Sequence, residues 1–198
     1  MGANIITDVR ITFSRADYGG EEGYTVLLND GDSRNLGGYL QCVRLVPWTP
    51  ETAELYIRRE ILGADACWNC LEPAGAEVMK ATPFLRGKGV FGVTYTNLDR
   101  RMRGEGLGQK MYLVMLYELA RRDAVLVPND SYESGGTSTA AFRVWGTLPR
   151  YGVKSIGGIF YWGGALGPDV YDPPPHARRD RGWLDRVKSR RRDLGPTE

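Results

Sequence analysis

The sequence predicts a single α/β domain with a mixed central sheet flanked by helices. Three observations predict it. Residues 88–98 are β-branched, aromatic and flanked by glycine, which is typical of a strand. Residues 109–122 contain no glycine or proline and carry apolar side chains around most of a helix circumference, which predicts a largely buried helix. Shorter strand-like runs precede both segments, and 198 residues are enough to bury one core.

The other elements follow from periodicity and from terminal signals. Alternation of Val9, Ile11 and Phe13 predicts a half-buried strand. Thr49 followed by Pro50 and an acid predicts the start of a helix. The full order is a strand at 4–15, a loop at 17–23, strands at 24–28 and 38–46 joined by a turn at 29–31, a helix from Thr49 to Gly63, an irregular stretch at 64–87 with a short helix near Glu77, the strand at 88–98, the helix at 109–122, a strand at 125–127, a helix over 138–148 and a last strand at 157–162.

A basic, glycine-rich turn joins the strand at 88–98 to the helix that follows, and it reads Arg103-Gly104-Glu105-Gly106-Leu107-Gly108. The first backbone N–H groups of a helix lack intrahelical partners, and the helix dipole favours an anion beside them. Glycines let a phosphate approach that backbone closely. The turn is not a Walker loop, because no Gly-Lys-Ser/Thr closes it, and it is not a dinucleotide fingerprint, because Gln109 stands where that pattern needs its last glycine. It predicts a phosphate site, the alternative being an ordinary strand-to-helix connection.

The pattern Arg-x-x-Gly-x-Gly resembles the pyrophosphate loop of the GCN5-related N-acetyltransferase (GNAT) family. The later order Ser138-x-x-Ala141-x-x-x-Trp145-x-x-Leu148 is similar to the family's Asn-x-x-Ala-x-x-x-Tyr helix. The resemblance covers about a third of the chain. It implies a mostly antiparallel sheet and an amine acceptor that attacks the thioester of acetyl-CoA directly. More loosely, the chain resembles compact acetyltransferases encoded by tailed bacteriophages.

The resemblance also implies which residues bind acetyl-CoA. The turn would hold the pyrophosphate, with charge from Arg103 and Lys110. The backbone around Leu98 would pair with the pantetheine arm and stabilise the oxyanion. The implied cosubstrate-binding residues are Leu98, Arg103, Gly104, Gly106, Leu107, Gly108, Gln109, Lys110 and Trp145.

An amine acceptor must lose a proton before it attacks, which calls for a general base. Asp130, directly after the strand at 125–127, is the preferred candidate, with a turn or capping role as the alternative. The other candidates are Tyr95, Asp99, Tyr132 and Glu77.

The leaving thiolate calls for a proton donor. Trp145 stands where many family members have a tyrosine, and an indole cannot supply a proton. Ser138, Tyr132 or Tyr151 would substitute, or no acid is needed, since a thiolate of pKa about 8.5 leaves without help. Core packing is the favoured interpretation of Trp145.

The sequence does not fix the acceptor; the likeness to bacteriophage acetyltransferases implies a modified nucleobase amine or a protein amine. The family places a helical acceptor segment between its first two strands, whereas the first helix predicted here follows a hairpin. A non-catalytic acyl-CoA-binding or nucleic-acid-binding module is the alternative function.

The segment 173–198 differs from the domain predicted for 1–172. Three prolines open it, and it carries eight basic against four acidic side chains in a chain of net charge +2. A basic tail suggests nucleic acid. Packing of Trp183 and Leu184 against the domain is the favoured alternative.

The chain has three cysteines, Cys42, Cys67 and Cys70, and one histidine. An odd cysteine count argues against a disulfide framework, and the Cys67–Cys70 pair supplies only half of a zinc site, so no metal is predicted. No apolar run approaches the ~20 residues that cross a bilayer, and no signal peptide is visible. These features predict a cytoplasmic chain with no membrane contact.

Overall fold

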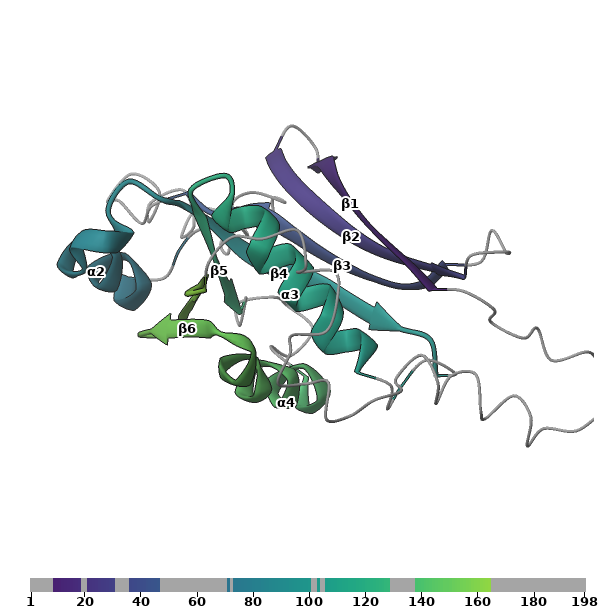
Figure 1. Ribbon diagram of the computed structural model, residues 1–198. Coiled ribbons are helices and arrows are strands. Elements are labelled where there is room, and N and C mark those ends of the chain that lie inside the picture. Colours follow the sequence, from purple (N-terminus) through teal and green to yellow (C-terminus); the bar gives the residue numbers. More distant parts are fainter. Residues whose placement is uncertain are drawn as a thin grey trace, which may run out of the picture.

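The computed structural model describes residues 9–18, 21–30, 36–46, 71, 73–100, 103, 106–128 and 138–164. They form an α/β domain in which a seven-stranded mixed sheet carries three α-helices (Figure 1). Several sequence predictions lie outside these residues: the helix at 49–63, the Cys67–Cys70 pair, Gly104, Asp130, Tyr132 and the basic tail from 173.

The strands follow the spatial order β1-β2-β3-β4-β5-β7-β6, and only the pair β4–β5 is parallel. The sheet is therefore mixed and mostly antiparallel. The strands are β1 Val9–Tyr18, β2 Glu21–Asp30, β3 Leu36–Arg44, β4 Gly89–Leu98, β5 Ala124–Pro128, β6 Val153–Ile156 and β7 Ile159–Trp162. The α-helices are α2 Pro73–Ala81, α3 Leu107–Ala120 and α4 Thr139–Thr147; two short 3-10 segments, η1 Pro83–Leu85 and η3 Leu148–Tyr151, adjoin them.

The elements predicted between residues 73 and 148 are confirmed: β4, α3, β5, α4 and the short helix near Glu77, which is α2. The loop predicted at 17–23 is wrong, because β1 continues to Tyr18 and β2 begins at Glu21, paired without interruption. Cross-strand hydrogen bonds there outweigh the low strand propensity of the acidic residues. The last strand begins at Ile159, and β6 was missed. Gly157 and Gly158 have φ values of 54° and 80°, as a two-residue type I′ hairpin turn requires.

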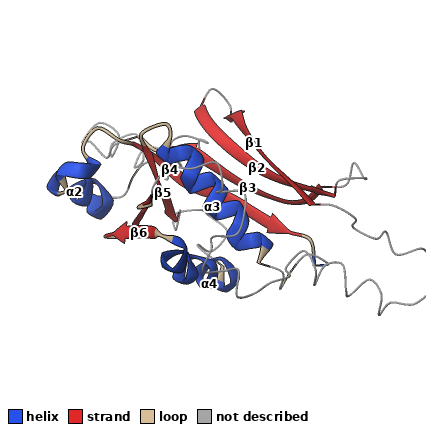
Figure 2. Cartoon of the chain, in the orientation of Figure 1, coloured by secondary structure: helices blue, strands red, loops and turns tan. Residues whose placement is uncertain are grey.

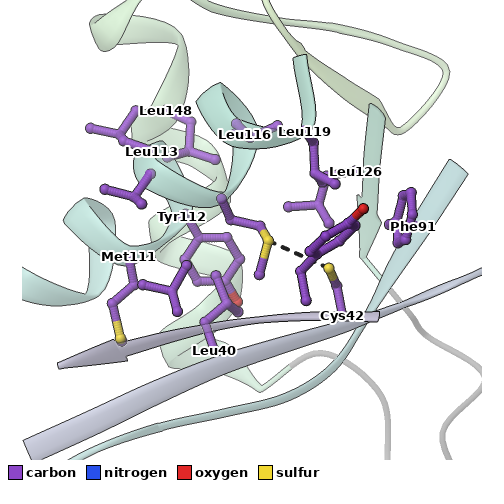
Figure 3. Close-up of a cluster of buried hydrophobic side chains, with 14 of the residues drawn as sticks. Leu40, Cys42, Phe91, Met111, Tyr112, Leu113, Leu116, Leu119, Leu126 and Leu148 are labelled. Atoms are coloured by element: carbon purple, nitrogen blue, oxygen red, sulfur yellow. Dashed lines mark hydrogen bonds between the residues drawn. The ribbon is translucent and has the colours of Figure 1, made fainter. Parts of the chain in front are cut away.

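Helices cover the sheet on both faces. Helix α3 lies across one face with α4 beside it (Figure 2). Eleven of the fourteen residues of α3 are buried, as its predicted apolar circumference requires. The core on this face joins α3 to β2, β3, β4, β5 and α4, and within it the thiol of Cys42 lies 3.4 Å from the sulfur of Met115 (Figure 3). A second cluster on the opposite face includes Leu85 of η1 and Ala76 of α2.

Candidate functional site

The pairing between strands β4 and β5 ends at Val93 of β4. The parallel register runs from Gly89 opposite Ala124 to Val93 opposite Pro128, where β5 ends. Strand β4 continues to Leu98, paired with β3 alone among the described residues. Within the described ranges, the stretch Thr94–Leu98 therefore has an open edge on the side where β5 ends. Backbone N–H and C=O groups on such an edge are available to an extended ligand.

A β-bulge lies at the parting point. In the pairing of β3 with β4, Cys42 faces Val93 and Gln41 faces Tyr95, so Thr94 is an extra residue on β4. The Thr94 hydroxyl donates to the carbonyl of Gln41 at 3.4 Å. Because a bulge bends its strand and increases the local twist, it turns β4 away from its neighbour immediately after the last β5 pair.

The helix α3 begins beside the far end of this open edge. Gly106 precedes it with φ 73°, a left-handed conformation that strains any residue with a side chain. No side-chain hydrogen bond caps the helix, and its first turn has no acid. This end of α3 therefore combines a glycine backbone with the positive end of the helix dipole.

Arg103 ties the turn back to the strand. Its Nε donates to the carbonyl oxygen of Leu98, the last residue of β4, at 3.0 Å, and the side chain is exposed. The exposed guanidinium therefore lies close to the open edge and to the start of α3. Lys110, by contrast, is 7% exposed and buried within α3.

Gly108 marks how closely three elements meet. A Cβ added there would lie 3.8 Å from Val144 Cγ2 of α4 and 3.9 Å from Leu98 Cδ2 of β4. The first turn of α3 thus stands between the end of β4 and the side of α4. Leu98 and Gly108, for which the family resemblance implies a role in binding the cosubstrate, are adjacent in space.

A polar network fixes α4 against the same turn. Gln109 Nε2 donates to the hydroxyl of Thr147 at 2.6 Å, and that hydroxyl donates to the Val144 carbonyl at 2.7 Å. The Tyr151 hydroxyl donates to Gln109 Oε1 at 3.5 Å. Gln109 therefore holds α4 and η3 in place.

Tyr112 joins the open half of β4 to α3, and the sequence did not predict this role. Its hydroxyl lies 3.1 Å from that of Thr96, and burial raises the pKa of Tyr112 although the Thr96 bond opposes the rise. A protonated phenol thus lies at residue 96, two residues beyond the bulge. In the sequence, Tyr112 follows Gly108 by four residues, and this spacing places the two residues on the same face of a helix.

Trp145 is 5% exposed, as its core-packing interpretation predicts. Its ring packs edge-on against Tyr112, with centroids 4.7 Å apart, and lies 4.4 Å from Phe160. The Trp145 indole therefore packs against the Tyr112 ring and helps to fix its position.

The other proton-transfer candidates are more scattered. Ser138 caps α4 and accepts a hydrogen bond from the Ala141 N–H at 3.2 Å. Glu77 is exposed on α2, 3.0 Å from Lys80, and Asp99 follows the end of β4. Tyr95 points to the sheet face opposite α3, because its neighbour Thr96 reaches Tyr112 and side chains alternate along a strand.

Within the described ranges, no cluster of three or more histidine, cysteine, aspartate or glutamate side chains is placed to bind a metal ion. In the same part of the chain, no helix has the length and apolarity needed to span a membrane. Comparison with protein-family models, with curated proteins and with solved structures gives no match.

Proposed function

We propose that the chain is an acetyl-CoA-dependent N-acetyltransferase with a GNAT-like fold. The observation that carries this proposal is the parting of β4 from β5 at the Thr94 bulge, beside the start of α3. An open strand edge binds an extended chain of amides, and a glycine-lined helix start binds phosphate. Acetyl-CoA carries both groups in one molecule, a two-amide arm and a diphosphate. The open edge ends at Leu98, next to Gly108 in the first turn of α3, so one molecule can contact both.

In this proposal, each part of acetyl-CoA contacts a different part of the β4–α3 unit. The diphosphate lies against Gly106 and Gly108 with Arg103 beside it, and the amide arm lies along Thr94–Leu98. The thioester reaches the bulge, where the strands part and an amine approaches from the other side. A backbone N–H on the open edge stabilises the oxyanion that forms when the amine attacks.

Two proton transfers complete the reaction. Asp130 follows β5 in the chain and is the assigned base for the incoming ammonium. The phenol of Tyr112 is a further donor for the departing thiolate, through Thr96. Ser138, Tyr132 and Tyr151 keep the roles that the sequence predicts for them.

A non-catalytic acyl-CoA-binding module is the second candidate, and the observation that favours it is Trp145, whose indole N–H donates a hydrogen bond but is too weakly acidic to protonate a thiolate. The two candidates differ in turnover. Release of free CoA thiol in the presence of a panel of primary amines identifies the enzyme. Binding of acetyl-CoA without release, across the whole panel, identifies the module.

Binding is tested by calorimetric titration of acetyl-CoA into the protein and into two arginine variants. Arg103 and Arg86 are a matched pair, since both are exposed and each Nε donates to a main-chain carbonyl. Arg103→Ala should weaken binding about tenfold, the loss of one charge-assisted contact. Arg86→Ala, at the end of η1, should leave it unchanged. Absence of acetyl-CoA binding by the folded wild-type protein at about 1 mM would overturn the proposal.

A further inference from the structure

Two tyrosines form a stacked pair on the sheet face opposite α3. The rings of Tyr39 on β3 and Tyr95 on β4 have centroids 5.4 Å apart and planes 8° from parallel. Tyr95 is nonetheless 49% exposed, far more than an aromatic ring that serves only the core. Within the described residues, such a ring offers a flat surface with one side exposed.

The position of Tyr95 relates this surface to the open edge. Tyr95 follows the bulge residue Thr94, so it is the first residue of β4 beyond the parting point. Tyr39 lies on its β3 side. On the other side β5 has already ended, since its last residue, Pro128, pairs with Val93. The described part of the chain thus places a stacking partner on one side of Tyr95 and no β5 residue on the other.

The neighbouring side chains decide what would stack there. The residues around the pair on β3 and β4 are Gln41, Thr94 and Asn97, all uncharged and able to donate and accept hydrogen bonds. Burial, the charge of an ionised Tyr95 and a side-chain hydrogen bond with Tyr95 raise the pKa of Tyr39, so its phenol is neutral as well. A cationic alkylamine gains most beside a carboxylate, which these residues do not provide. A flat, neutral ring with polar edges gains both stacking and hydrogen bonds.

We propose that Tyr95, supported by Tyr39, is the stacking surface for a planar, uncharged ring that carries the acceptor amine. The role of the ring as the acetyl acceptor rests on the proposed function. Binding of the ring to Tyr95 does not depend on it. The ring would enter from the face opposite α3 and bring its amine to the bulge.

Ligand-observed NMR titrations test the proposal with three probes: adenosine and aniline, which are planar, and cyclohexylamine, a saturated alkylammonium. The wild-type protein should bind both planar probes at least about tenfold more tightly than cyclohexylamine. Tyr95→Leu should weaken the planar probes by about tenfold, whereas Tyr95→Phe, which keeps the ring, should stay within about twofold.

Phe84→Leu is the matched control. Phe84 is 51% exposed and packs against Tyr161 with centroids 4.8 Å apart, so it is an equally exposed aromatic on another element. Its substitution should leave all three probes unchanged. Equal binding of cyclohexylamine and aniline, no planar binding to the folded protein, or unaltered binding in Tyr95→Leu would each overturn the proposal.

A calorimetric titration of acetyl-CoA into the same variants separates this inference from the proposed function. The amide arm would pair with the β4 backbone, and the Tyr95 side chain lies on the face opposite α3, so Tyr95→Leu should still bind acetyl-CoA. If acetyl-CoA fails to bind while the planar probes bind, the acetyltransferase proposal fails and the ring site stands. If acetyl-CoA binds and the probes do not discriminate, the ring site fails alone.

Discussion

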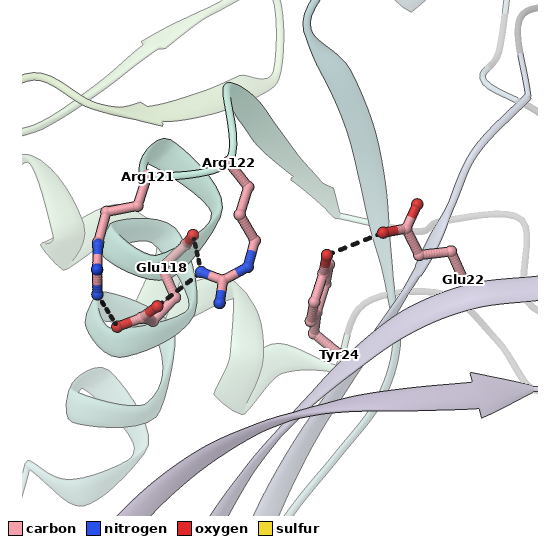
Figure 4. Close-up of polar contacts among 5 residues, drawn as sticks. All are labelled: Glu22, Tyr24, Glu118, Arg121 and Arg122. Atoms are coloured by element: carbon pink, nitrogen blue, oxygen red, sulfur yellow. Dashed lines mark hydrogen bonds and ion pairs between the residues drawn. The ribbon is translucent and has the colours of Figure 1, made fainter.

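The two ends of α3 are built in opposite ways. At the C-terminal end, the Glu118 carboxylate is 6% exposed and accepts from Arg121 Nη1 at 3.3 Å and from Arg122 Nη1 at 2.7 Å (Figure 4). The Arg122 guanidinium also lies over the rings of Phe13 and Tyr24, 4.7 and 5.4 Å from their centroids. The ion pairs hold the two arginines against the last turns of α3, and the cation–π contacts of Arg122 fasten this end to β1 and β2.

The N-terminal end starts without a side-chain cap, and Gln109 of its first turn contacts α4 through Thr147. Gly106 supplies no side-chain cap, and the first turn carries no acid. Side-chain capping of a helix start typically contributes about 1 kcal/mol, which this helix forgoes. The two ends of α3 therefore have different roles. Side-chain contacts fix the C-terminal end, which is remote from the open edge. Backbone N–H groups without a side-chain cap remain at the N-terminal end, where an anion can bind them.

The largest expected effect comes from breaking the fastened end. Glu118→Ala leaves two arginines beside a buried gap, which should lower the free energy of unfolding by about 2–4 kcal/mol. Thermal unfolding followed by circular dichroism measures this loss. Acetyl-CoA affinity measured below the transition should be unchanged, because the open edge lies at the other end of α3.

Glu77→Ala is the control for that loss. Its carboxylate pairs with Lys80 at 3.0 Å, but the two side chains are 74% and 71% exposed. An exposed pair contributes about 0–1 kcal/mol, so this variant should unfold close to the wild-type temperature. Equal destabilisation by the two substitutions would mean that the buried clamp does not fasten the helix.

The second effect concerns the open end. Gly108→Ala adds a methyl group at ordinary contact distance from Leu98 and Val144, and alanine favours a helix over glycine by about 0.5–1 kcal/mol. The variant should therefore be as stable as the wild type or more so. The same methyl narrows the approach to the α3 backbone, so acetyl-CoA binding should weaken about tenfold or more by calorimetry.

Gly146→Ala separates the two consequences. Gly146 lies within α4, and an added Cβ meets nothing within 4 Å. This variant should gain similar stability and keep its affinity for acetyl-CoA. Unchanged acetyl-CoA binding in Gly108→Ala would remove the phosphate site from this end of the helix.

The sequence predicted the elements of the open end better than their arrangement. Strand β4, the glycine turn and helix α3 each follow from local composition and periodicity. The bulge at Thr94 does not, because pairing with β3 and the end of β5 create it, and both partners are distant in sequence. The pair Gly157-Gly158 is typical of a two-residue hairpin turn, and the prediction of a strand from residue 157 is wrong there.

The fastened end was predictable in part. Glu118, Arg121 and Arg122 stand at spacings of three and four residues, which favours ion pairs on one helix face. Burial of Glu118 and the approach of Arg122 to Phe13 and Tyr24 arise only when β1 and β2 pack against α3. Side-chain pairs across elements, such as Tyr112 with Thr96, were beyond local patterns for the same reason.

The third effect concerns the middle of α3. Tyr112→Phe removes the hydroxyl that lies 3.1 Å from Thr96, which should cost about 1 kcal/mol of stability. In the double variant with Thr96→Val, the two losses should not add, since both remove one bond. Chemical denaturation of the four proteins measures the coupling. If Tyr112 also protonates the thiolate, the kcat of Tyr112→Phe falls while its affinity for acetyl-CoA is unchanged. Additive losses of stability in the double variant would show that the Tyr112–Thr96 hydrogen bond does not join β4 to α3.

The smallest effect is a change in pH dependence next to the fastened end. The Tyr24 hydroxyl donates to Glu22 Oε1 at 2.9 Å and, with Arg44 at 2.9 Å, holds the pKa of Glu22 below its usual value against the opposing effect of burial. A carboxyl group with a lowered folded pKa stabilises the fold above its unfolded pKa, about 4.3, and this contribution is lost as the pH falls through the folded pKa. Glu22→Gln should therefore reduce the decline in urea midpoint between about pH 5 and 3. Tyr24→Phe removes the largest cause of the shift and should reduce the decline similarly, with no further change in the double variant. Wild-type and Glu22→Gln curves that stay parallel throughout the acid range would show that Glu22 does not contribute to the fastening of this end.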